Sequence, residues 1–515
     1  MILERVQTSS GRHKGTLRRR GCQSVNRMHR MHLKADQSNG WPNRPTGPPG
    51  KLGVARFSSL PTRPSIHYPV SMSVFKTYDI RGLWDIEIDA SLAYRIGRGL
   101  ARYMKAREFL LGYDARLHSP ELYRTVAGGL AEEGVKVAGT GLASTPQLHY
   151  TQINGKFPAG VMVTASHNPP QYHGFKVFDA KGGSLSYDKG LRKVEALSAG
   201  IAAPSSIRTV DPRPVEGLDT YVRFVAKVSG GKKLGEKIVI DASCGSAGPV
   251  FRNLAEVLGM AAVLLNEKPD GNFPAHDPNP LKSESREQAA RTVRDTGAAF
   301  GVVLDGDGDR ILFVDEKGQG IENYFLSCLV AEELLTRAPG ASIVYDLISS
   351  RVLPERVREL GGTPVVSRVG YTFLYDRMIA ASAVFGAETS GHVYFKVSDT
   401  YYTESAAYAL VVLTGLLATR GRPLSELVAP LRSRYVQSPE INVEVKDKEK
   451  ALREVEKRYA KGRINKLDGV SVEFDDFWFN VRPSNTEPLL RLRLEARRAE
   501  VAQAKTEEIR AILTG

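Results

Sequence analysis

Three stretches of the chain repeat one pattern of apolar and polar residues. In each stretch an apolar run ends in an aspartate, a helical segment follows, and a glycine leads into a second β-branched run. The three apolar runs are EFLLGYD, EKIVID and ASIVYD, which end at Asp114, Asp241 and Asp346. Buried strands that alternate with helices are typical of βαβ units in a largely parallel sheet. We therefore expect three α/β domains of similar topology, although any α/β protein shows some similarity of this kind.

The pattern changes after about residue 433, where strand-like runs surround a polar loop and an amphipathic helix follows at 500–513. This change predicts a small α+β domain at the C-terminal end. The longest apolar run, at 406–418, is shorter than the roughly 20 residues that a membrane span requires, so it predicts a buried helix. The expected organisation is a separate segment at 1–71, α/β domains at 72–218, 219–322 and 323–432, and an α+β domain at 433–515.

The formal net charge of +14 is concentrated at one end of the chain. Residues 1–71 contain 13 Lys or Arg and 2 Asp or Glu, whereas the remaining residues contain 58 and 55. The body of the protein is therefore not expected to bind nucleic acid. The Arg-rich first segment lacks apolar periodicity and is predicted to be disordered. It could be a transit peptide, a basic tail or the result of a start assigned too early, and we favour the last because MSVFKTYDIRG from Met72 looks like a natural beginning.

Three cysteines, Cys22, Cys244 and Cys328, are scattered along the chain without a CxxC pair. This spacing predicts neither a disulfide scaffold nor a structural zinc site, and it favours a reducing compartment. We therefore expect a cytoplasmic protein.

The stretch VMVTASHNPPQYHGFKVF, at residues 161–178, predicts a strand, a sharp turn and a second strand. Ser166 and His167 lie at the turn, immediately before an Asn-Pro-Pro break. A serine at the end of a strand is expected to be exposed, in a position where loops often carry chemistry.

A second stretch, GVVLDGDGDRILFVDEKG, places three aspartates in alternation with glycines between two β-runs. Asp305, Asp307 and Asp309 would repel one another unless a cation lay between them, and hard oxygen ligands of this kind suit Mg²⁺ or Ca²⁺. Asp305 to Glu316 nearly matches a calcium EF-hand loop, but Arg310 replaces the glycine of the sharp turn. A solvated acidic turn without a metal is a further alternative.

Two more loops carry polar side chains suited to a ligand. Residues 384–395 place Glu388, Ser390 and His392 on one short loop that could bind sugar hydroxyls. Residues 480–488 combine an arginine with small polar residues, which suits a phosphate. A nucleophilic serine, a metal loop, a hydroxyl-binding loop and an anion-binding loop together suit phosphoryl transfer between the serine and a phosphorylated polyol in a cleft between domains.

The motifs TASHNPP, DGDGDR, GAETSGH and RPSNTEP occur in this order between residues 72 and 515. In these motifs the chain resembles the α-D-phosphohexomutases, in particular the phosphomannomutase/phosphoglucomutase group. The resemblance implies a heart-shaped architecture of four domains, with three related α/β domains that contain mixed sheets and a C-terminal α+β domain.

The resemblance also implies an activity. A mutase of this group interconverts hexose 1-phosphate and hexose 6-phosphate, here mannose, glucose or both, through a phosphoserine and a hexose 1,6-bisphosphate intermediate that also acts as activator. By this resemblance Ser166, Asp305, Asp307 and Asp309 hold one Mg²⁺ per chain. The basic cluster expected beside Ser166 consists of Arg81, Lys176, His167 and His392, and which of them is the general base stays open. The expected substrate-binding residues are Tyr78, Arg310, Arg368, Gly370, Glu388, Ser390, Arg482, Ser484, Asn485 and Thr486.

Some features leave alternatives open. The chain has RVGY at 368–371 where the group commonly has Lys-Thr-Gly-His, and YYTES at 401–405 replaces an acidic pair. The preference among sugars is therefore open, including a phosphoglucosamine mutase type of specificity. A metal-dependent phosphatase with an aspartate nucleophile, and a calcium- or nucleic-acid-binding protein without catalysis, are alternatives of other classes. The expected partner is a small phosphosugar, with no nucleic acid and no membrane, and the protein is expected to be a monomer or a dimer.

Overall fold

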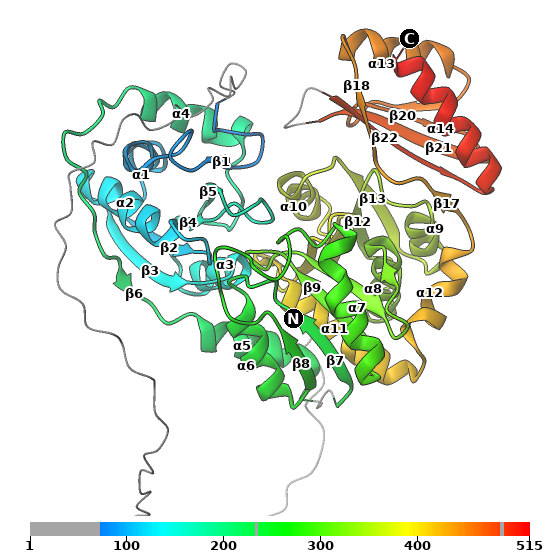
Figure 1. Ribbon diagram of the computed structural model, residues 1–515, viewed down its shortest axis with the longest axis horizontal. Coiled ribbons are helices and arrows are strands. Elements are labelled where there is room, and N and C mark those ends of the chain that lie inside the picture. The colour runs from blue at the N-terminus through cyan, green and yellow to red at the C-terminus, as the bar shows by residue number, and fades with distance from the viewer. Residues whose placement is uncertain (1–72, 232–234, 485–488, 515) are drawn as a thin grey trace, which may run out of the picture. The chain divides into compact units, whose positions relative to one another are not determined.

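The structure is a computed structural model that describes residues 73–231, 235–484 and 489–514. These residues form four β-sheets that follow one another along the chain, each with its own helices (Figure 1). The predicted disorder of residues 1–71 concerns a segment outside the described residues and stays a prediction. Within the described ranges, no helix is both long enough and apolar enough to cross a bilayer.

The first sheet has six strands and carries the loop that contains Ser166. Its strands, in spatial order, are β1 (Ile80–Leu83), β5 (Tyr172–Phe178), β4 (Gly160–Val163), β2 (Glu108–Tyr113), β3 (Lys136–Leu142) and β6 (Arg213–Pro214). Its helices are α1 (Ala90–Met104), α2 (Ser119–Glu132), α3 (Thr145–Asn154), the short η1 (Tyr187–Leu191) and α4 (Arg192–Ala199). Pairing is parallel from β4 to β6 and antiparallel at β1–β5 and β5–β4, so the sheet is mixed and its parallel part contains the βαβ pattern.

Strand β2 shows why the first apolar run contains almost no polar residues. Phe109 and Leu111 pack in the core formed with α1 and α2, whereas Leu110 packs on the opposite face with Leu148 of α3. Because side chains alternate between the faces of a strand, a strand covered on both faces must be apolar throughout. The run therefore places Asp114 directly after a strand whose central residues, 109–112, are buried.

The second sheet carries the aspartate loop. Its strands, in spatial order, are β11 (Gly320–Ile321), β10 (Ile311–Asp315), β9 (Phe300–Leu304), β7 (Lys237–Asp241) and β8 (Ala261–Leu265). Its helices are α5 (Leu218–Ala226), the short η2 (Lys227–Ser229), α6 (Gly248–Leu258) and α7 (Ser283–Thr296). Strands β8, β7 and β9 are parallel, and β9 and β10 are antiparallel, so the loop between them reverses the chain.

The third sheet repeats this arrangement and carries the loop with Glu388. Its strands, in spatial order, are β13 (Thr363–Ser367), β12 (Ser342–Asp346), β14 (Phe385–Ala387), β15 (Val393–Lys396) and β16 (Tyr402–Glu404). Its helices are α8 (Asn323–Arg337), α9 (Val352–Glu359), α10 (Tyr371–Ala380), α11 (Ala406–Arg420) and α12 (Leu424–Arg432). The apolar run at 406–418 is the buried helix that the sequence predicts.

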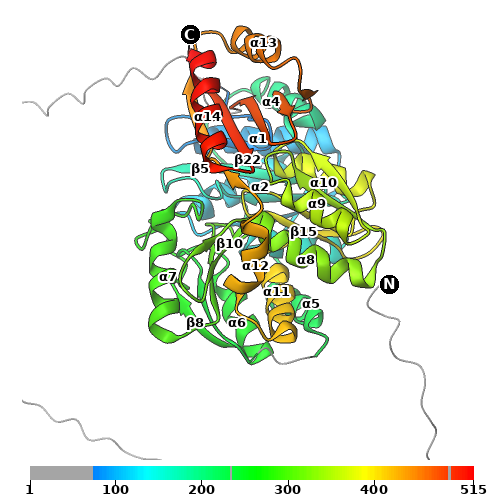
Figure 2. The ribbon, with the colours of Figure 1, turned by 90° about the vertical axis from the view of Figure 1, so that its right-hand side faces the viewer.

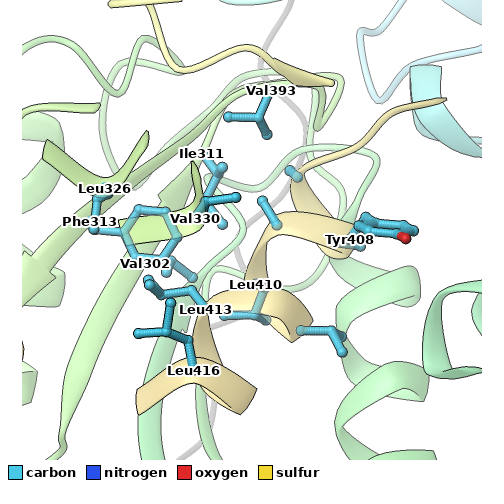
Figure 3. Packing of buried hydrophobic residues seen from close by; sticks show 14 of the residues in the cluster. Val302, Ile311, Phe313, Leu326, Val330, Val393, Tyr408, Leu410, Leu413 and Leu416 are labelled. Atoms are coloured by element: carbon cyan, nitrogen blue, oxygen red, sulfur yellow. The ribbon is translucent and has the colours of Figure 1, made fainter. Parts of the chain in front are cut away.

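The second and third sheets share one hydrophobic core. Figure 3 shows Leu410 and Leu413 of α11 close to Val302 and Phe313 of the second sheet, and Val330 of α8 belongs to the same cluster. Burial of apolar surface stabilises this contact by about 25 cal/mol for each Å² removed from water. A boundary near residue 322 therefore crosses a continuous core, which limits independent movement of the loops that the two sheets carry.

The C-terminal sheet is antiparallel. Its strands are β17 (Val436–Gln437), β22 (Leu489–Ala496), β21 (Phe477–Pro483), β20 (Val470–Glu473) and β19 (Arg463–Asn465) in spatial order, with β18 (Ile441–Glu444) also paired to β22. Helices α13 (Lys448–Arg458) and α14 (Ala499–Thr514) pack against it, as Figures 1 and 2 show. Strand β21 ends at Pro483, so it contains the first two residues of the RPSNTEP motif.

Candidate active site

Ser166 lies on a strained turn between β4 and β5. Its φ angle is +52°, a left-handed conformation that non-glycine residues adopt rarely and that often marks a functional site. The backbone N–H of Ser166 donates to Thr164 Oγ at 2.8 Å, which stabilises the turn. The prediction that this serine is exposed is wrong, because its side chain is fully buried under the aspartate loop. Its hydroxyl donates to Asp305 Oδ2 at 2.7 Å and lies 3.2 Å from His167 Nδ1.

The buried side chain of Arg116 stabilises this turn. Its buried guanidinium donates to the backbone carbonyls of Ser166 at 2.8 Å and Tyr172 at 2.9 Å, and also to those of Asn168 and Pro169. Asp114, at the end of β2, accepts from Arg116 Nε at 3.1 Å and balances its charge. Five N–H donors on a rigid planar group suit several carbonyls at once, so this arginine sets the shape of the serine loop.

The aspartate loop brings three carboxylates close to Ser166. Asp305, Asp307 and Asp309 are fully buried, and their oxygens approach one another within 4.8 Å. Gly306 allows close contact, because a Cβ there would lie 2.7 Å from the carbonyl oxygen of Ser166. Strands β9 and β10 flank the loop, whereas an EF-hand has helices on both sides, so the calcium-binding EF-hand alternative does not apply.

The three aspartates fit a hard divalent cation. Among the residues that the structure describes, Asp307 Oδ1 and Asp309 Oδ1 are buried without a hydrogen-bond partner. Lys176 Nζ lies 2.7 Å from Asp307 Oδ2 and also contacts Asp309 Oδ2, so an ammonium group already supplies positive charge here. Orphaned carboxylate oxygens around a cation position are the donors that Mg²⁺ takes.

The buried charged groups of the aspartate loop and Lys176 shift one another's pKa values. Burial and the neighbouring Asp309 and Asp307 raise the pKa of Asp305 well above its ordinary value. Burial acts in the same direction on Asp307, but contact with Lys176 lowers the pKa of Asp307 below its ordinary value. Burial opposes the charge of Lys176, yet Asp307 and Asp309 raise the pKa of Lys176 well above its ordinary value. The lysine is therefore a cation at neutral pH.

Other basic groups surround the serine. Arg81 donates to Asp79 Oδ2 at 2.6 Å and to Asn168 Oδ1 at 2.8 Å, so it is tied to the serine loop. Burial, followed by the positive charges of Arg310 and Arg81, lowers the pKa of His167 well below its ordinary value. His167 is therefore a neutral imidazole beside the Ser166 hydroxyl.

Arg310 joins the aspartate loop to His392 of the third sheet. Its Nε donates to His392 Nε2 at 2.8 Å and lies 3.9 Å from Asp305 Oδ2. His392 Nδ1 contacts Glu404 Oε1, and Tyr394 donates its hydroxyl to the same oxygen at 2.7 Å. Burial lowers the pKa of His392, but the nearby carboxylates of Asp309 and Glu404 raise it by more, so the net direction is upward.

The loop with Glu388 is connected to the first domain. Glu388 is buried and accepts from the backbone N–H of Gly370 at 2.7 Å and from Ser390 Oγ at 3.0 Å. Gly370 has a φ of +132°, and a Cβ there would lie 2.5 Å from the ring of Tyr78. Tyr78 also donates its hydroxyl to the carbonyl of Val369 at 2.8 Å. Four predicted substrate-binding residues are therefore linked by successive contacts, from Tyr78 through Gly370 and Glu388 to Ser390.

The remaining predicted residues lie further from the serine. Arg368 is exposed and stacks 4.2 Å above the ring of Phe373. Arg482 is buried in β21 and donates to Glu440 Oε2 at 2.6 Å, and the backbone N–H of Ser484 donates to Leu489 at 2.9 Å. Burial, followed by the carboxylates of Glu388 and Asp468, raises the pKa of Tyr78, and the charges of Arg482 and Arg368 oppose that shift. Asn485 and Thr486 lie outside the described residues, and their predicted roles stay predictions.

Three residues of this site escaped the sequence-based prediction. They are Arg116, Thr145 and Glu404, all of which act through contacts with distant parts of the chain. Thr145, at the start of α3, donates its hydroxyl to Asp307 Oδ2 at 2.6 Å across 162 positions of sequence. The Ser-Thr-Pro start of α3 predicts a helix N-terminus but gives no sign of the aspartate that it meets.

Comparison with protein-family models gives matches along most of the described region. The models for α/β/α domains I, II and III of phosphoglucomutase/phosphomannomutase match residues 72–203, 219–318 and 323–435. The model for the C-terminal domain of the same family matches residues 440–512.

Curated relatives and solved structures agree with these matches. The chain is 37% identical to a phosphomannomutase of Methanocaldococcus jannaschii over 86% of this chain and 98% of that protein. It is 36% identical to a phosphomannomutase of Escherichia coli strain K12 over 83% of this chain and 95% of that protein. A crystal structure of a phosphoglucomutase/phosphomannomutase family protein from Burkholderia thailandensis superposes with a TM-score of 0.77 at 31% identity, covering 86% of this chain and 97% of that one.

Proposed function

This chain belongs to the phosphoglucomutase/phosphomannomutase family, and we propose that it interconverts the 1-phosphate and 6-phosphate of mannose, glucose or both through a phosphoserine at Ser166. Family membership makes it a phosphohexomutase, an enzyme that transfers a phosphoryl group within a hexose phosphate. The observation that carries the proposal is the 2.7 Å contact between Ser166 Oγ and Asp305 Oδ2, which brings a serine hydroxyl against three carboxylates from another domain.

In the proposed cycle, phosphorylated Ser166 transfers its phosphoryl group to the free hydroxyl of a hexose phosphate. The bond between phosphorus and Ser166 Oγ breaks as the bond to the sugar oxygen forms, and the proton of the sugar hydroxyl passes to a nearby acceptor. The product is a hexose 1,6-bisphosphate. It turns end for end in the site and returns its other phosphoryl group to Ser166.

The residues around the serine support this chemistry by their charge. A phosphoserine carries roughly −1.5 to −2 charges at neutral pH, and Lys176, Arg310 and Arg81 provide positive charge in the same buried region. Such fixed charges in a water-excluded site stabilise a moving phosphoryl group more strongly than solvent does. The neutral imidazole of His167 lies 3.2 Å from the serine hydroxyl, and the Asp305 carboxylate accepts from that hydroxyl at 2.7 Å, so both lie within reach of a proton at this position.

We propose that Asp305, Asp307 and Asp309 hold one Mg²⁺ together with an oxygen of phosphorylated Ser166. The buried, orphaned oxygens of Asp307 and Asp309 and the close approach of all three carboxylates support this assignment. When bound, the metal would supply charge compensation for the phosphoryl group.

Two further loops would hold the sugar in both of its orientations. Glu388 and Ser390 would contact hydroxyls that both orientations share, which leaves the configuration at C2 unread and lets mannose and glucose both serve. Arg482, Ser484, Asn485 and Thr486 would hold the phosphate that is not reacting, with Tyr78, Arg368 and Gly370 at the opening of the site.

The alternatives of other classes are less well supported. The relatives are named phosphomannomutases, which favours neither an aspartate-dependent phosphatase nor a binding protein without catalysis. The preferred sugar, a monomeric or dimeric state and a cytoplasmic location remain predictions from the sequence.

A coupled assay tests the proposal. Mannose 1-phosphate and glucose 1-phosphate are supplied in turn with Mg²⁺ and a trace of hexose 1,6-bisphosphate, and formation of the 6-phosphate is followed. We expect turnover with at least one of these sugars and its loss in Ser166→Ala. Ser283→Ala, which alters an exposed serine at the start of α7, is the matched control and should keep normal activity. A fully active Ser166→Ala variant would refute the assignment.

A further inference from the structure

Phe273 lies beside both loops that meet at Ser166. It belongs to residues 266–282, which connect β8 to α7, and its side chain is almost fully buried. Arg116 Cζ lies 5.2 Å from the centroid of the Phe273 ring. A Cβ added to Gly306 of the aspartate loop would lie 3.4 Å from Cε1 and from Cζ of the same ring. One aromatic ring therefore borders the arginine that shapes the serine loop and the glycine where the aspartate loop approaches it.

The guanidinium of Arg116 has only its two faces left for a further contact. A guanidinium has five N–H groups in one plane. In Arg116 all five donate, to four backbone carbonyls between Ser166 and Tyr172 and to the carboxylate of Asp114. The side chain has no exposed surface, and this burial lowers the pKa of Arg116. An aromatic face, such as that of Phe273, stabilises a desolvated cation without using an N–H group.

The loop that carries Phe273 is fixed to the second domain. The backbone N–H of Asp270 donates to the carbonyl of Cys244 at 2.8 Å. His276 Nε2 lies 3.2 Å from Oδ2 of Asp241, the last residue of β7. Between these two contacts, Phe273 has a φ of +49°, a left-handed conformation that a bulky residue keeps only where its surroundings enforce it. The loop therefore presents the ring in a defined position.

The same loop also packs on the first domain. A Cβ added to Gly271 would lie 2.5 Å from the carbonyl oxygen of Ala115 and 2.5 Å from the backbone nitrogen of Leu117, the two residues that flank Arg116. So close an approach of two backbones requires a glycine. Gly271 packs on the backbone at Arg116 while Phe273 lies against its guanidinium, so the loop holds this arginine at two points.

We propose that Phe273 is a positioning residue that holds the Arg116 guanidinium, and through it Ser166, in place against the aspartate loop. Phe273 acts through Arg116 and does not touch the reacting atoms. Its loss should therefore disturb the alignment of Ser166 with Asp305 more than the binding of the sugar, most of whose predicted contacts come from the third and C-terminal domains. The kinetic part of this inference rests on the proposed mutase function, whereas the placement of the serine loop does not.

Kinetics of Phe273→Leu test the role of the ring. Leucine keeps an apolar side chain but has no aromatic face. We expect kcat to fall by about 10-fold to 100-fold because the reacting atoms are misplaced, with little change in KM because substrate binding is retained. Phe325→Leu is the matched control and should keep normal kcat. Phe325 is also buried beside an arginine, with Arg432 Cζ 5.7 Å from its ring centroid, but it lies in the core shared by the second and third sheets.

Gly271→Ala tests the loop without changing the ring. The added methyl group should push the loop away from the backbone at Arg116, so kcat should fall as it does in Phe273→Leu. The double variant should lose little more than either single variant, because both changes release the same contact. Losses that multiply in the double variant would contradict a shared route through Arg116.

Hydrogen–deuterium exchange of the full-length protein without substrate measures the serine loop itself. In Phe273→Leu the backbone amides of residues 164–172 should exchange faster than in wild type and in Phe325→Leu. Peptides from α11 should exchange as in wild type, which separates a local opening from a general loss of stability. The same comparison applies to Gly271→Ala, which decides the matter if Phe273→Leu does not fold.

The possible results are distinct. Wild-type kcat in Phe273→Leu, a lower kcat without faster exchange at the serine loop, or exchange that rises equally in all peptides would overturn the proposed role of Phe273. If the protein catalysed no phosphohexose interconversion at all, the proposed function would fail, but the exchange measurement would still decide whether Phe273 holds the serine loop.

Discussion

Gly306 is the point of closest approach between the serine loop and the aspartate loop. A Cβ added at this position would lie 2.7 Å from the carbonyl oxygen of Ser166, closer than carbon and oxygen atoms pack without displacement. That carbonyl cannot move freely, because Arg116 donates to it at 2.8 Å. Gly306→Ala should therefore push the aspartates away from the serine hydroxyl, while its own backbone conformation suits alanine.

The size of the effect follows from the contact. Insertion of a methyl group into a packed site costs about 1–3 kcal/mol. If most of this free energy raises the activation barrier by misaligning the reacting groups, kcat/KM falls by about 10-fold to 100-fold, since about 1.4 kcal/mol corresponds to a factor of ten. A displacement of about 1 Å is enough for a loss of about 100-fold when reacting atoms must be aligned.

The assay compares kcat/KM for the 1-phosphate to 6-phosphate reaction with the free energy of unfolding from urea titration. Gly415→Ala is the matched control, because Gly415 lies in α11 and, apart from adjacent residues and the backbone of its own helix, no atom would lie within 4 Å of the added methyl group. This variant should keep its activity and gain up to about 1 kcal/mol of stability. Activity of Gly306→Ala within about twofold of the wild type would refute the claim that these two loops meet in the working enzyme.

Two further predictions concern buried charges. Burial, and then the charges of Arg116 and His118, lower the pKa of His173 to about 3. Between pH 6.5, about the pKa of the unfolded group, and pH 3, only the unfolded chain binds this proton. The free energy of unfolding therefore decreases as the pH is lowered through this range. In urea titrations at pH 7 and pH 5, wild type should lose about 2 kcal/mol more than His173→Phe, and equal losses would contradict the shift. Lys176→Met should lower the melting temperature of the metal-free protein, because Asp307 and Asp309 lose their cation. Added Mg²⁺ should then raise the melting temperature of the variant more than that of the wild type, because the metal replaces the lost ammonium charge beside Asp307 and Asp309. An equal rise in both proteins would argue against the idea that the Lys176 ammonium and Mg²⁺ compensate the same carboxylates.

The sequence predicts well those features that depend on local pattern. The strand before Asp114 is predicted correctly because both of its faces are buried, which excludes polar residues from the run. The helix predicted at 406–418 is also correct, because most of its residues are buried and the run is therefore apolar. The turn at Ser166 is also predicted, because the Asn-Pro-Pro break separates two strand-like runs, which are β4 and β5 in the structure.

Features that depend on contacts between distant segments could not be predicted in this way. The burial of Ser166 comes from a loop 139 positions further along the chain, so a local pattern suggests exposure instead. Arg116 and Glu404 show no motif of their own, since their partners are backbone carbonyls and a histidine selected by the fold. The shared core of the second and third sheets is likewise invisible in a division of the chain by pattern.

The central claim is that Ser166 carries the phosphoryl group. Mass spectrometry of the full-length protein, after incubation with hexose 1,6-bisphosphate and Mg²⁺, tests this most directly. We predict the gain of one phosphate, mapped by peptide analysis to Ser166, and its removal when hexose 1-phosphate is then added in excess. A phosphate on another residue that turns over with substrate, or the same gain in Ser166→Ala, would contradict the account.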